Sequence, residues 1–395
     1  MQLRKEKDMI NFDFKKNCYG CELCKNICPN NAIEMKENEN GFLNPVVNMK
    51  KCVHCGLCER KCLFLNERPV EKIEESCQAY AAQINDKERL KKSSSGGFFY
   101  QVAIEFIKDG GYIAGCIWNA EMMPMHILSN KIEDIRKMQG SKYVQSDLAN
   151  VFNDIKNVIN EKKVLFIGTP CQVKAAKECI NNENLYTISL ICEGVPSRKV
   201  WKLYKESLED AKKSKLIGVN FKNKENCGWK MPDSVYVFEN SRKLKKLSYN
   251  LDYYVSSFIG GLIMNEKCYS CNFKGNNNQG DIVIGDFWKV PDELFGSETK
   301  DGISAVIVKT EKGNKMLNLL NNIHLIKVDM NLIVIGNPNL NNSIQRPLER
   351  ESFFEKIDDI NINDNFRRCN KKLNSCKKKI LKVLYDIKIL KFLKK

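Results

Sequence analysis

The stretches CYGCELCKNICP (residues 18–29) and CVHCGLCERKCL (residues 52–63) share one cysteine spacing, C-x2-C-x2-C-x3-C. In this spacing three thiolates bind one [4Fe–4S] cluster, and the fourth binds a neighbouring cluster. The eight expected ligands are Cys18, Cys21, Cys24, Cys28, Cys52, Cys55, Cys58 and Cys62. The pattern predicts a small ferredoxin-like α+β module that transfers electrons.

The two repeats are expected to exchange their fourth ligands. The predicted ligand groups are Cys18, Cys21, Cys24 and Cys62 for one cluster, and Cys28, Cys52, Cys55 and Cys58 for the other. Pro29 follows the first repeat, as in bacterial two-cluster ferredoxins, whereas Leu63 takes that place in the second. The missing proline removes no ligand. The alternative interpretation is that the cysteines bind zinc and only stabilise a small fold.

The chain has 395 residues and a hydrophobic content of 43%, which is enough for a sizeable core besides the cysteine module. We expect three parts: the two-cluster ferredoxin domain over residues 1–70, a larger domain over 71–335, and a connector with a basic apolar tail over 336–395. Most of the 18 cysteines stand at metal-binding spacing. No apolar leader precedes them, and no run of about 18 apolar residues occurs, so a reducing cytoplasm is the expected setting.

The net charge of +16 is concentrated at the C-terminus. Residues 367–395 hold twelve Lys or Arg against one acid, Asp386, a net +11 that leaves +5 for the other 366 residues. A mildly basic body suits an anionic substrate or coenzyme, and we predict no nucleic-acid binding. The basic apolar tail is compatible with peripheral contact to an anionic membrane, with docking on a partner, or with packing on this domain's own core.

The larger domain shows alternating strand and helix patterns. Residues 163–168 form an apolar run typical of a buried strand, residues 172–180 fit a helix, and residues 185–191 fit the next strand. Further strands are expected at residues 111–118, 125–129, 215–221, 234–239, 281–287 and 304–310. Such alternation predicts an α/β fold with a mainly parallel sheet flanked by helices.

A second group of cysteines is expected beside this sheet. Cys171 and Cys192 follow two parallel strands, so both should lie at the carboxyl edge of the sheet, where open α/β sheets bind ligands. Cys268 and Cys271 form a C-x2-C pair further along the chain. We predict that these four cysteines bind a third [4Fe–4S] cluster. The alternative is that the first two are buried small apolar residues and the pair is half of a zinc site.

Five motifs then suggest a family. SSGGFF (94–99), GSKYVQS (140–146), GTPCQ (168–172), CEGVPS (192–197) and C-x2-C followed by GDIVIGDFW (280–288) occur in this order after the cysteine repeats. This arrangement resembles the coenzyme F420 hydrogenase/dehydrogenase beta-subunit family of iron–sulfur flavoproteins over about residues 10–310. The resemblance supports the third cluster and implies that the chain binds FAD.

No G-x-G-x-x-G follows any expected strand, so the flavin needs another cradle. Ser94, Ser95, Gly96 and Gly97 at a helix start offer hydroxyls and free backbone N–H groups to a pyrophosphate, although they also fit an ordinary helix cap. Further cofactor-binding candidates are Ser141, Lys142, Tyr143, Gln145, Ser146, Thr169 and Pro170. Lys142 and Asp286 are the catalytic candidates; a solvated lysine and an acid that closes a turn are the alternatives.

Together these features predict an FAD-dependent iron–sulfur oxidoreductase that passes electrons between [4Fe–4S] clusters and a two-electron site. Its substrate would be F420 or another anionic redox coenzyme, and its partner a redox subunit or a ferredoxin. One alternative is an electron-transfer adaptor without its own catalysis. Another is a membrane-associated redox component of surface-polysaccharide biosynthesis.

Overall fold

The structure is a computed structural model, and it describes residues 17–226, 228–247 and 251–369. The predicted basic tail lies outside the described residues from position 370 onward, so its membrane contact stays a prediction. The described α-helices are α2 (Leu23–Asn26), α3 (Leu57–Arg60), α4 (Lys87–Lys92), α5 (Phe98–Lys108), α6 (Ile132–Met138), α7 (Val151–Val158), α8 (Pro170–Cys179), α9 (Arg198–Lys212), α11 (Tyr253–Ile259), α12 (Asp292–Phe295), α13 (Glu311–Asn318), α14 (Met330–Gly336), α15 (Arg350–Glu355) and α16 (Ile362–Cys369). Short 3-10 helices are η2 (Glu266–Ser270), η3 (Gly275–Asn277), η4 (Gly296–Asp301) and η5 (Pro338–Leu340).

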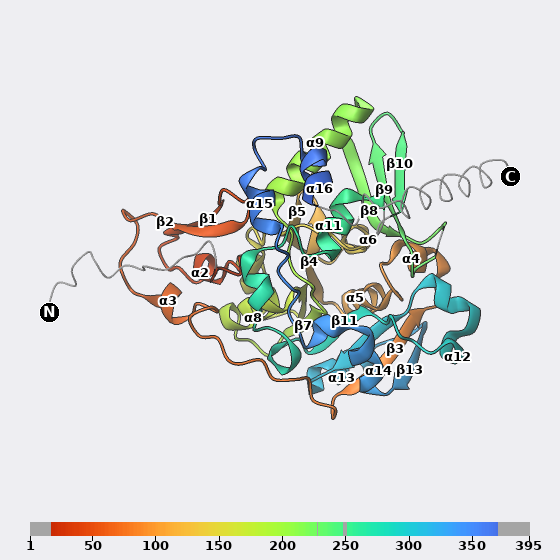
Figure 1. Cartoon of the computed structure of the whole chain (residues 1–395). Coiled ribbons are helices and arrows are strands. Elements are labelled where there is room, and N and C mark those ends of the chain that lie inside the picture. The colour runs from red at the N-terminus through yellow and green to blue at the C-terminus, as the bar shows by residue number, and fades with distance from the viewer. Residues whose placement is uncertain (1–16, 227, 248–250, 370–395) are drawn as a thin grey trace.

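A small N-terminal module, red to orange at the left of Figure 1, contains both cysteine repeats. Its strands β1 (Ile33–Glu37) and β2 (Leu43–Val47) pair antiparallel into a hairpin. Each cysteine repeat contains one four-residue helix, α2 or α3. The expected small ferredoxin-like module is present.

The larger part is built on an eight-stranded sheet. Across the sheet the strands are β13 (Ile323–Val328), β3 (Gln78–Ile84), β12 (Ser304–Val308), β11 (Ile282–Asp286), β7 (Leu185–Leu190), β6 (Val164–Gly168), β4 (Tyr112–Trp118) and β5 (Pro124–Ser129). The central strands β4, β6, β7 and β11 are parallel neighbours. The β6–α8–β7 unit expected from the sequence is therefore confirmed.

The margins of this sheet differ from the expectation. β3, β12 and β13, and β5 at the other edge, pair antiparallel with their neighbours, so the sheet is mixed and the prediction of a mainly parallel sheet is wrong there. An apolar run reveals that a strand is buried but not its direction. Residues 119–123 join adjacent ends of β4 and β5, and residues 287–303 do the same for β11 and β12, which makes each pair antiparallel.

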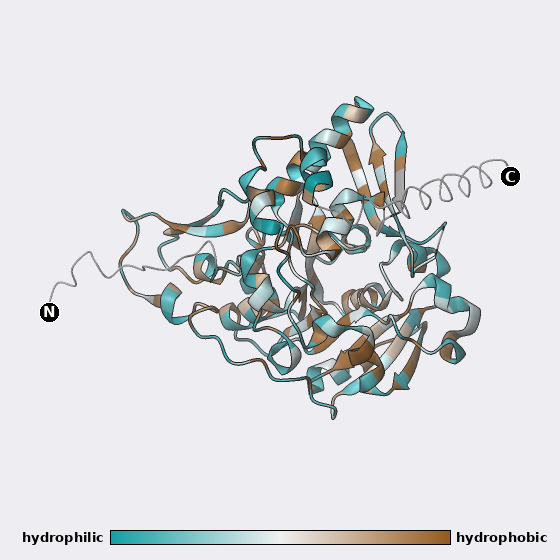
Figure 2. Ribbon diagram, viewed as in Figure 1, coloured by the Kyte–Doolittle hydropathy of each residue, from teal (hydrophilic) through white to brown (hydrophobic). Residues whose placement is uncertain are grey.

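Helices cover both faces of the sheet. On one face α5, α6 and α13 contribute to a single apolar core. On the other face α7 and α8 cover the β4–β7 half, and α14 covers the half around β3 and β12. Figure 2 shows apolar residues along the inner strands and hydrophilic residues on the outer helices. This layering leaves the carboxyl edge of the parallel strands accessible to loops.

A second, three-stranded antiparallel sheet stands beside the first. It consists of β8 (Leu216–Asn223), β9 (Asp233–Phe238) and β10 (Lys243–Leu247). With α9, α11, α15 and α16 it encloses an aromatic core. Phe353 and Phe366 of α15 and α16 are fully buried there, so part of the expected connector after residue 335 belongs to the folded core.

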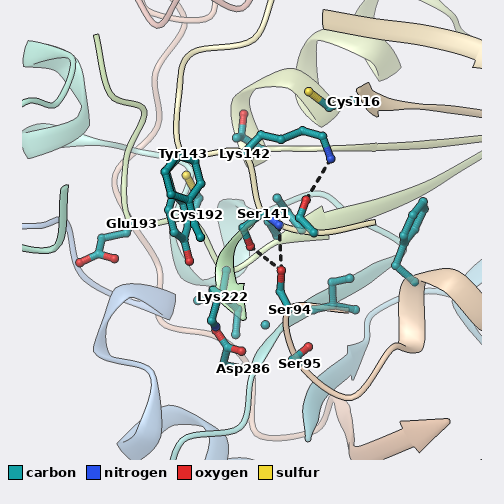
Figure 3. A pocket seen from close by; sticks show the side chains of 18 of the residues that line it. Ser94, Ser95, Cys116, Ser141, Lys142, Tyr143, Cys192, Glu193, Lys222 and Asp286 are labelled. Carbon is teal, nitrogen blue, oxygen red and sulfur yellow. Dashed lines mark hydrogen bonds and ion pairs between the residues drawn. The ribbon is translucent and has the colours of Figure 1, made fainter. Parts of the chain in front are cut away.

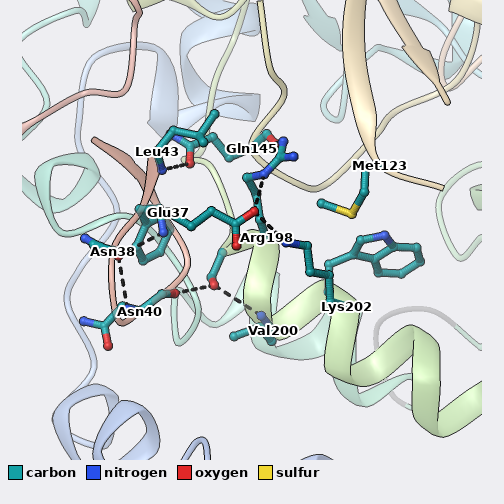
Figure 4. A network of polar contacts seen from close by, with 12 residues as sticks. Glu37, Asn38, Asn40, Leu43, Met123, Gln145, Arg198, Val200 and Lys202 are labelled. Carbon is teal, nitrogen blue, oxygen red and sulfur yellow. Dashed lines mark hydrogen bonds and ion pairs between the residues drawn. The ribbon is translucent and has the colours of Figure 1, made fainter. Parts of the chain in front are cut away.

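The ferredoxin module is docked on the larger part through a partly buried polar network (Figure 4). The Arg198 Nε donates to the Glu37 carboxylate at 2.9 Å, and the Lys202 ammonium donates to the same carboxylate at 2.7 Å. The buried Gln145 side-chain oxygen accepts a hydrogen bond from the Leu43 backbone N–H at 2.8 Å. These contacts join β1 and β2 to the start of α9 and to the loop after α6.

The hairpin turn adds a close backbone contact. Gly41 has a φ of +78°, and its carbonyl accepts from the Arg198 backbone N–H at 3.0 Å. The Ser197 hydroxyl donates to the neighbouring Asn40 carbonyl at 2.5 Å. A Cβ at Gly41 would lie 2.2 Å from the Cβ of Lys199, so only glycine fits between the turn and α9.

We predict that Gly41→Ala loosens this docking. The clash with α9 should destabilise the protein by about 1–3 kcal/mol, the usual cost of overpacking. Thermal unfolding and the rate of proteolytic release of the N-terminal module measure the effect.

Gly110→Ala is the matched control. Gly110 has the same φ of +78°, but a Cβ there would meet no atom within 4 Å. Both variants carry similar backbone strain, so equal stability and equal proteolysis of the two would contradict the docking role of Gly41.

Candidate functional site

The two cysteine repeats form loops of the same backbone shape. Gly20 and His54 hold equivalent positions with φ of 65° and 53°. Glu22 and Gly56 also correspond, with φ of 56° and 68°, and each precedes a four-residue helix. Left-handed conformations at two non-glycine residues are uncommon and are fixed by their surroundings. His54 is an exposed loop residue. The shared backbone shape is what two binding sites of the same kind would have.

The first loop meets the last cysteine of the second repeat. Burial, together with the proximity of Cys62, raises the pKa of Cys18 to about 12. Burial likewise raises the pKa of Cys21 and Cys24, with added contributions from Cys18 and Cys62. A small apolar cavity of about 60 Å³ separates these thiols. Cys58 lines the same cavity. Cys62 thus lies beside the first loop, where the predicted exchange of fourth ligands needs it, and the assignment of ligands to the two clusters stays a prediction.

The second loop lies beside the end of the first repeat. The Asn30 side chain donates to the Lys51 carbonyl at 3.3 Å, which brings the chain after Cys28 next to Cys52. The Cys28 sulfur accepts from the Ala32 backbone N–H at 3.3 Å. Cys55 is exposed, so the second loop faces the outside of the molecule.

The four other predicted ligands converge at the sheet edge. Cys171 lies in the first turn of α8, directly after β6, and Cys192 follows β7. Cys268 lies in η2 and Cys271 follows that helix. Burial raises the pKa of Cys171 and Cys268, and each is raised further by both Cys192 and Cys271.

Backbone N–H groups point at this sulfur group. Burial raises the pKa of Cys192 to about 11, which the backbone N–H of Gly194 opposes. The N–H groups of Val195 and Phe273 act in the same way on Cys268 and Cys271. Among the described residues no three or more His, Cys, Asp or Glu side chains are arranged to hold a metal ion. Three of these four half-buried thiols receive backbone N–H groups, and Cys171 lies 3.2 Å from the Thr169 hydroxyl. Ligands of an iron–sulfur cluster bind separate corners of a larger cube, so they do not converge on one point as the ligands of a single metal ion do.

The first cysteine loop and this sheet-edge group are neighbours. Burial and the proximity of Cys271 are larger causes of the raised pKa of Cys171, and Cys21 lies close enough to raise this pKa as well. Both cysteines pack against the same apolar cluster. Tyr19 stacks edge-on against Phe273 with ring centroids 4.9 Å apart, which joins the chain beside Cys18 to the chain beyond Cys271.

A buried ion pair closes the same boundary. The Lys267 ammonium lies 2.8 Å from the Glu67 carboxylate and 5.4 Å above the centre of the Tyr19 ring. The Tyr19 hydroxyl also donates to Glu67. Lys267 precedes Cys268, so this cluster of side chains fixes the two cysteine groups relative to each other.

A cavity of about 500 Å³ opens on the other side of Cys192 (Figure 3). Its lining includes most of the predicted flavin residues and both catalytic candidates. These lining residues are Ser94, Ser95, Gly97, Ser141, Lys142, Tyr143, Ser146, Thr169 and Asp286. Cys192 therefore belongs both to the sulfur group and to the cavity wall.

One end of the cavity is rich in hydroxyls. The Ser94 hydroxyl lies 2.8 Å from the Ser141 hydroxyl and accepts from the Ser141 backbone N–H at 2.8 Å. Gly97 is the N-cap of the eleven-residue helix α5, has a φ of +82°, and provides no side-chain cap. The start of α5 thus presents backbone N–H groups and the positive end of the helix dipole to this end of the cavity.

Another part of the cavity wall is aromatic. Tyr143 stacks on Phe258 with ring centroids 4.2 Å apart and on Phe221 at 5.3 Å. All three residues line the cavity. A flat conjugated ring would find an apolar stacking surface here.

Lys142 is not a solvated side chain. Its ammonium donates to the carbonyls of Met138, Gln139 and Gly140 at 3.0–3.1 Å, which closes the C-terminal end of α6. Burial lowers the pKa of Lys142 to about 8. The residue lines the cavity, but its charge is largely directed to its own loop.

Asp286 is held in an ion pair. Its carboxylate accepts from the buried Lys222 ammonium at 2.5 Å and from the Trp229 indole N–H at 2.9 Å. Lys222 also lies 4.8 Å above the centre of the Trp288 ring. The strand-end acid therefore positions a cation at the cavity wall.

Three predicted cofactor residues do not line the cavity. Gln145 binds the Leu43 backbone of the ferredoxin module. Gly96 packs so closely on β3 that a Cβ would lie 1.9 Å from the Ala82 carbonyl. Pro170 is buried at the first position of α8. For these residues the motif shapes the backbone around the cavity.

Comparison with known families identifies the chain. The family model for the C terminus of the coenzyme F420 hydrogenase/dehydrogenase beta subunit matches residues 161–330, and a 4Fe-4S dicluster domain matches residues 17–65. The chain belongs to the F420 hydrogenase/dehydrogenase beta-subunit family. It is an iron–sulfur electron-transfer protein of that type, and the dicluster match supports two [4Fe–4S] clusters in its N-terminal module.

A solved structure also matches this chain. A chain of the F420-reducing [NiFe] hydrogenase complex from Methanosarcina barkeri matches with a TM-score of 0.45 and 17% identity, over 73% of this chain and 94% of that one. No match was found among curated proteins. Within the described part of this family member, no helix is long and apolar enough to cross a membrane.

Sequence analysis missed several cavity residues of this family member. Lys222 lies in β8, and nothing in KLIGVNFK distinguishes it from a surface lysine. Glu193 lies in the motif CEGVPS, and burial raises its pKa to about 7, opposed by the nearby charges of Lys274 and Lys222. Cys116 and His126 pair across β4 and β5, so only the strand register reveals that they share a face.

His126 predicts a pH dependence of stability. Its Nε2 donates to the Ile167 carbonyl at 3.2 Å, and burial lowers its pKa from 6.5 to about 4. The unfolded chain binds a proton at this residue below about pH 6.5, while the folded chain does not until about pH 4. Stability should therefore fall as the pH drops from about 7 to about 5, by about 2 kcal/mol from this residue.

The His126→Gln variant tests this. Denaturant unfolding at several pH values should show a smaller acid-induced loss than in the wild type. The exposed His324→Gln change serves as the control. An unchanged pH slope in His126→Gln would show that His126 does not remain neutral in the folded chain.

Proposed function

We propose that this chain is an FAD-dependent iron–sulfur oxidoreductase that carries electrons between its ferredoxin module and a two-electron substrate. The observation that carries the proposal is the position of Cys192, which belongs to a group of four half-buried cysteines and also lines the 500 Å³ cavity. A third cluster bound there would lie between the first ferredoxin cluster and the cavity.

The residues fit a third [4Fe–4S] cluster at Cys171, Cys192, Cys268 and Cys271. Burial alone opposes the thiolate form of all four side chains. Iron compensates this cost because a coordinating thiol is deprotonated by the metal charge. The backbone N–H groups of residues 194, 195 and 273 then stabilise the sulfur charge.

The residues also fit FAD in the cavity. The hydroxyls of Ser94 and Ser141 and the uncapped start of α5 suit a pyrophosphate. The stacked side chains of Tyr143 and Phe258 suit a flat ring. A flavin exchanges two electrons with an organic partner and single electrons with iron–sulfur clusters, which is the chemistry this order of sites needs.

The chain's own residues prepare the cavity for an anionic substrate. Asp286 holds Lys222 at the wall, and the Trp288 ring shields that ammonium from water. Because F420 carries several negative charges, Lys222 is a suitable contact for F420 or for another anionic redox coenzyme. We propose Lys222 as the recognition residue, Asp286 as its positioning residue, and Lys142 as a support of the loop that forms the cavity wall.

Partners follow from the same proposal. A redox subunit or a ferredoxin would exchange single electrons with the N-terminal module. An adaptor without catalysis would have no need for a cavity of this size beside Cys192, so the cavity favours the enzyme.

Iron content tests the third cluster. Anaerobically purified protein should contain about twelve iron atoms per chain, because the proposal implies three four-iron clusters. Cys268→Ala should lower this to about eight while the two ferredoxin clusters remain. Iron and sulfide analysis together with EPR spectroscopy of the reduced protein measures both values.

Cys179→Ala is the control for that experiment. Cys179 lies at the end of α8, in the same helix as Cys171, but outside the four-cysteine group. Eight iron atoms in the wild type, or equal iron loss in both variants, would rule out the third cluster.

Flavin content tests the cavity. Ser94→Asp places a negative charge beside the proposed pyrophosphate site, and we expect retained FAD to fall from about one per chain to a small fraction of that. Ser297→Asp adds the same charge at an exposed residue of η4 and should keep its FAD. Flavin absorbance after release from protein measures both; equal FAD in the two variants would contradict the assignment.

Activity is tested by adding F420H2, NADH or a reduced ferredoxin to the reconstituted protein under anaerobic conditions. Bleaching of the flavin together with the clusters is the expected result for at least one donor. If no donor changes either spectrum while both cofactors are present, the chain is not this oxidoreductase.

A further inference from the structure

The two cysteine loops have the same shape but different surroundings. In the first loop, Tyr19 follows the first cysteine and is 6% exposed, because it packs against the larger part of the molecule. In the second loop the equivalent residue is Val53, which is 59% exposed. The first loop thus uses this face to approach the sheet-edge cysteines, while the second presents the same face to solvent.

More apolar surface surrounds the second loop. Met49 is 49% exposed and lies in the turn just before this loop. The turn is closed by a hydrogen bond from the Cys52 backbone N–H to the Asn48 carbonyl. Cys55 is exposed, whereas Cys18 and Cys21 of the first loop are half-buried. Exposed apolar side chains beside a redox centre are typical of a contact surface for another protein.

The rim of this surface is basic. Residues 49–61 contain Lys50, Lys51, Arg60 and Lys61 against one acid, Glu59, a net charge of +3. The Lys61 ammonium forms an ion pair with the Glu178 carboxylate of α8 at 2.8 Å. Lys50 and Lys51 are exposed in the turn between Met49 and Cys52. A partner that approaches Val53 therefore meets positive charge, which attracts an acidic protein.

We propose that the exposed second cysteine loop, residues 49–55 with Lys50, Lys51 and Val53 at its centre, is the docking surface for an acidic protein that carries a one-electron centre. The proposal rests on the proposed function and adds the place and the charge of the partner. In each encounter the carrier is oxidised by one electron and this chain is reduced by one, with no proton transfer. The contact is small, as is usual for transient redox encounters.

The positions of the two cysteine loops support electron entry at the second loop. One loop of the module faces the chain's own third cysteine group, and the second loop points outward (Figure 1). Electrons that arrive at the outer loop pass through the module to the inner loop and from there to the sheet edge. The fixed docking by Glu37, Arg198 and Gln145 keeps this path in place.

The test uses a reduced, acidic two-cluster ferredoxin as the probe and follows reduction of the full-length holoprotein by anaerobic stopped-flow absorbance. Lys50→Glu/Lys51→Glu should lower the second-order rate constant by about tenfold or more at low ionic strength. The difference from wild type should shrink as salt is added, because exposed charges are screened. Val53→Ser should slow the reaction with little change in its salt dependence.

Lys213→Glu/Lys215→Glu is the matched control, since both lysines are exposed beyond the end of α9, away from the module. It carries the same change in net charge and should react like the wild type. A loss of rate in this control equal to that of Lys50→Glu/Lys51→Glu, or wild-type rates in both, would overturn the docking surface.

Dithionite separates this proposal from the proposed function. It is a small reductant, so it should reduce the clusters of every variant at the wild-type rate. If dithionite reduces the clusters but the flavin never follows, the proposed function fails whatever the ferredoxin rates are. If instead Val53→Ser changes only the sedimentation coefficient of the chain, a second copy occupies this surface and the acidic carrier is excluded.

Discussion

The parallel pairing of β6 with β7 is the constraint on which the site depends. Because both strands end at the same edge of the sheet, Cys171 at the start of α8 and Cys192 after β7 are brought together. The C-x2-C pair around η2 completes the group from a distant part of the chain. The thiols are buried, so this edge is a costly place for thiolates unless iron binds them.

The remaining architecture is arranged around that edge. The ferredoxin module is clamped by Gly41, Gln145 and the Glu37–Arg198 ion pair, so its inner cysteine loop contacts the apolar cluster that also holds Cys171. On the other side the same edge forms the wall of the large cavity. A linear order of module, sheet-edge cysteines and cavity results, and the fixed spacing suits electron transfer better than a mobile module would.

Much of this could be predicted from the sequence, because cysteine spacing and strand–helix alternation are local patterns. The eight module cysteines, the β6–α8–β7 unit and the position of Cys171 and Cys192 at one edge all follow from such patterns. Strand direction at the margins could not be predicted, since it depends on where the connections run. The functions of single polar residues were equally hidden: Lys142 closes α6, Asp286 holds Lys222, and Gln145 holds the module. Each of these depends on a partner that is distant in sequence or on the local fold of a loop.

The central claim is that an iron–sulfur cluster lies at the sheet edge between the module and the cavity. The most direct measurement is an anomalous-difference map at the iron absorption edge, from crystals grown without oxygen. The account predicts three separate iron peaks, the third enclosed by the side chains of Cys171, Cys192, Cys268 and Cys271. A map with peaks only in the N-terminal module, and four free thiols at the sheet edge, would contradict it.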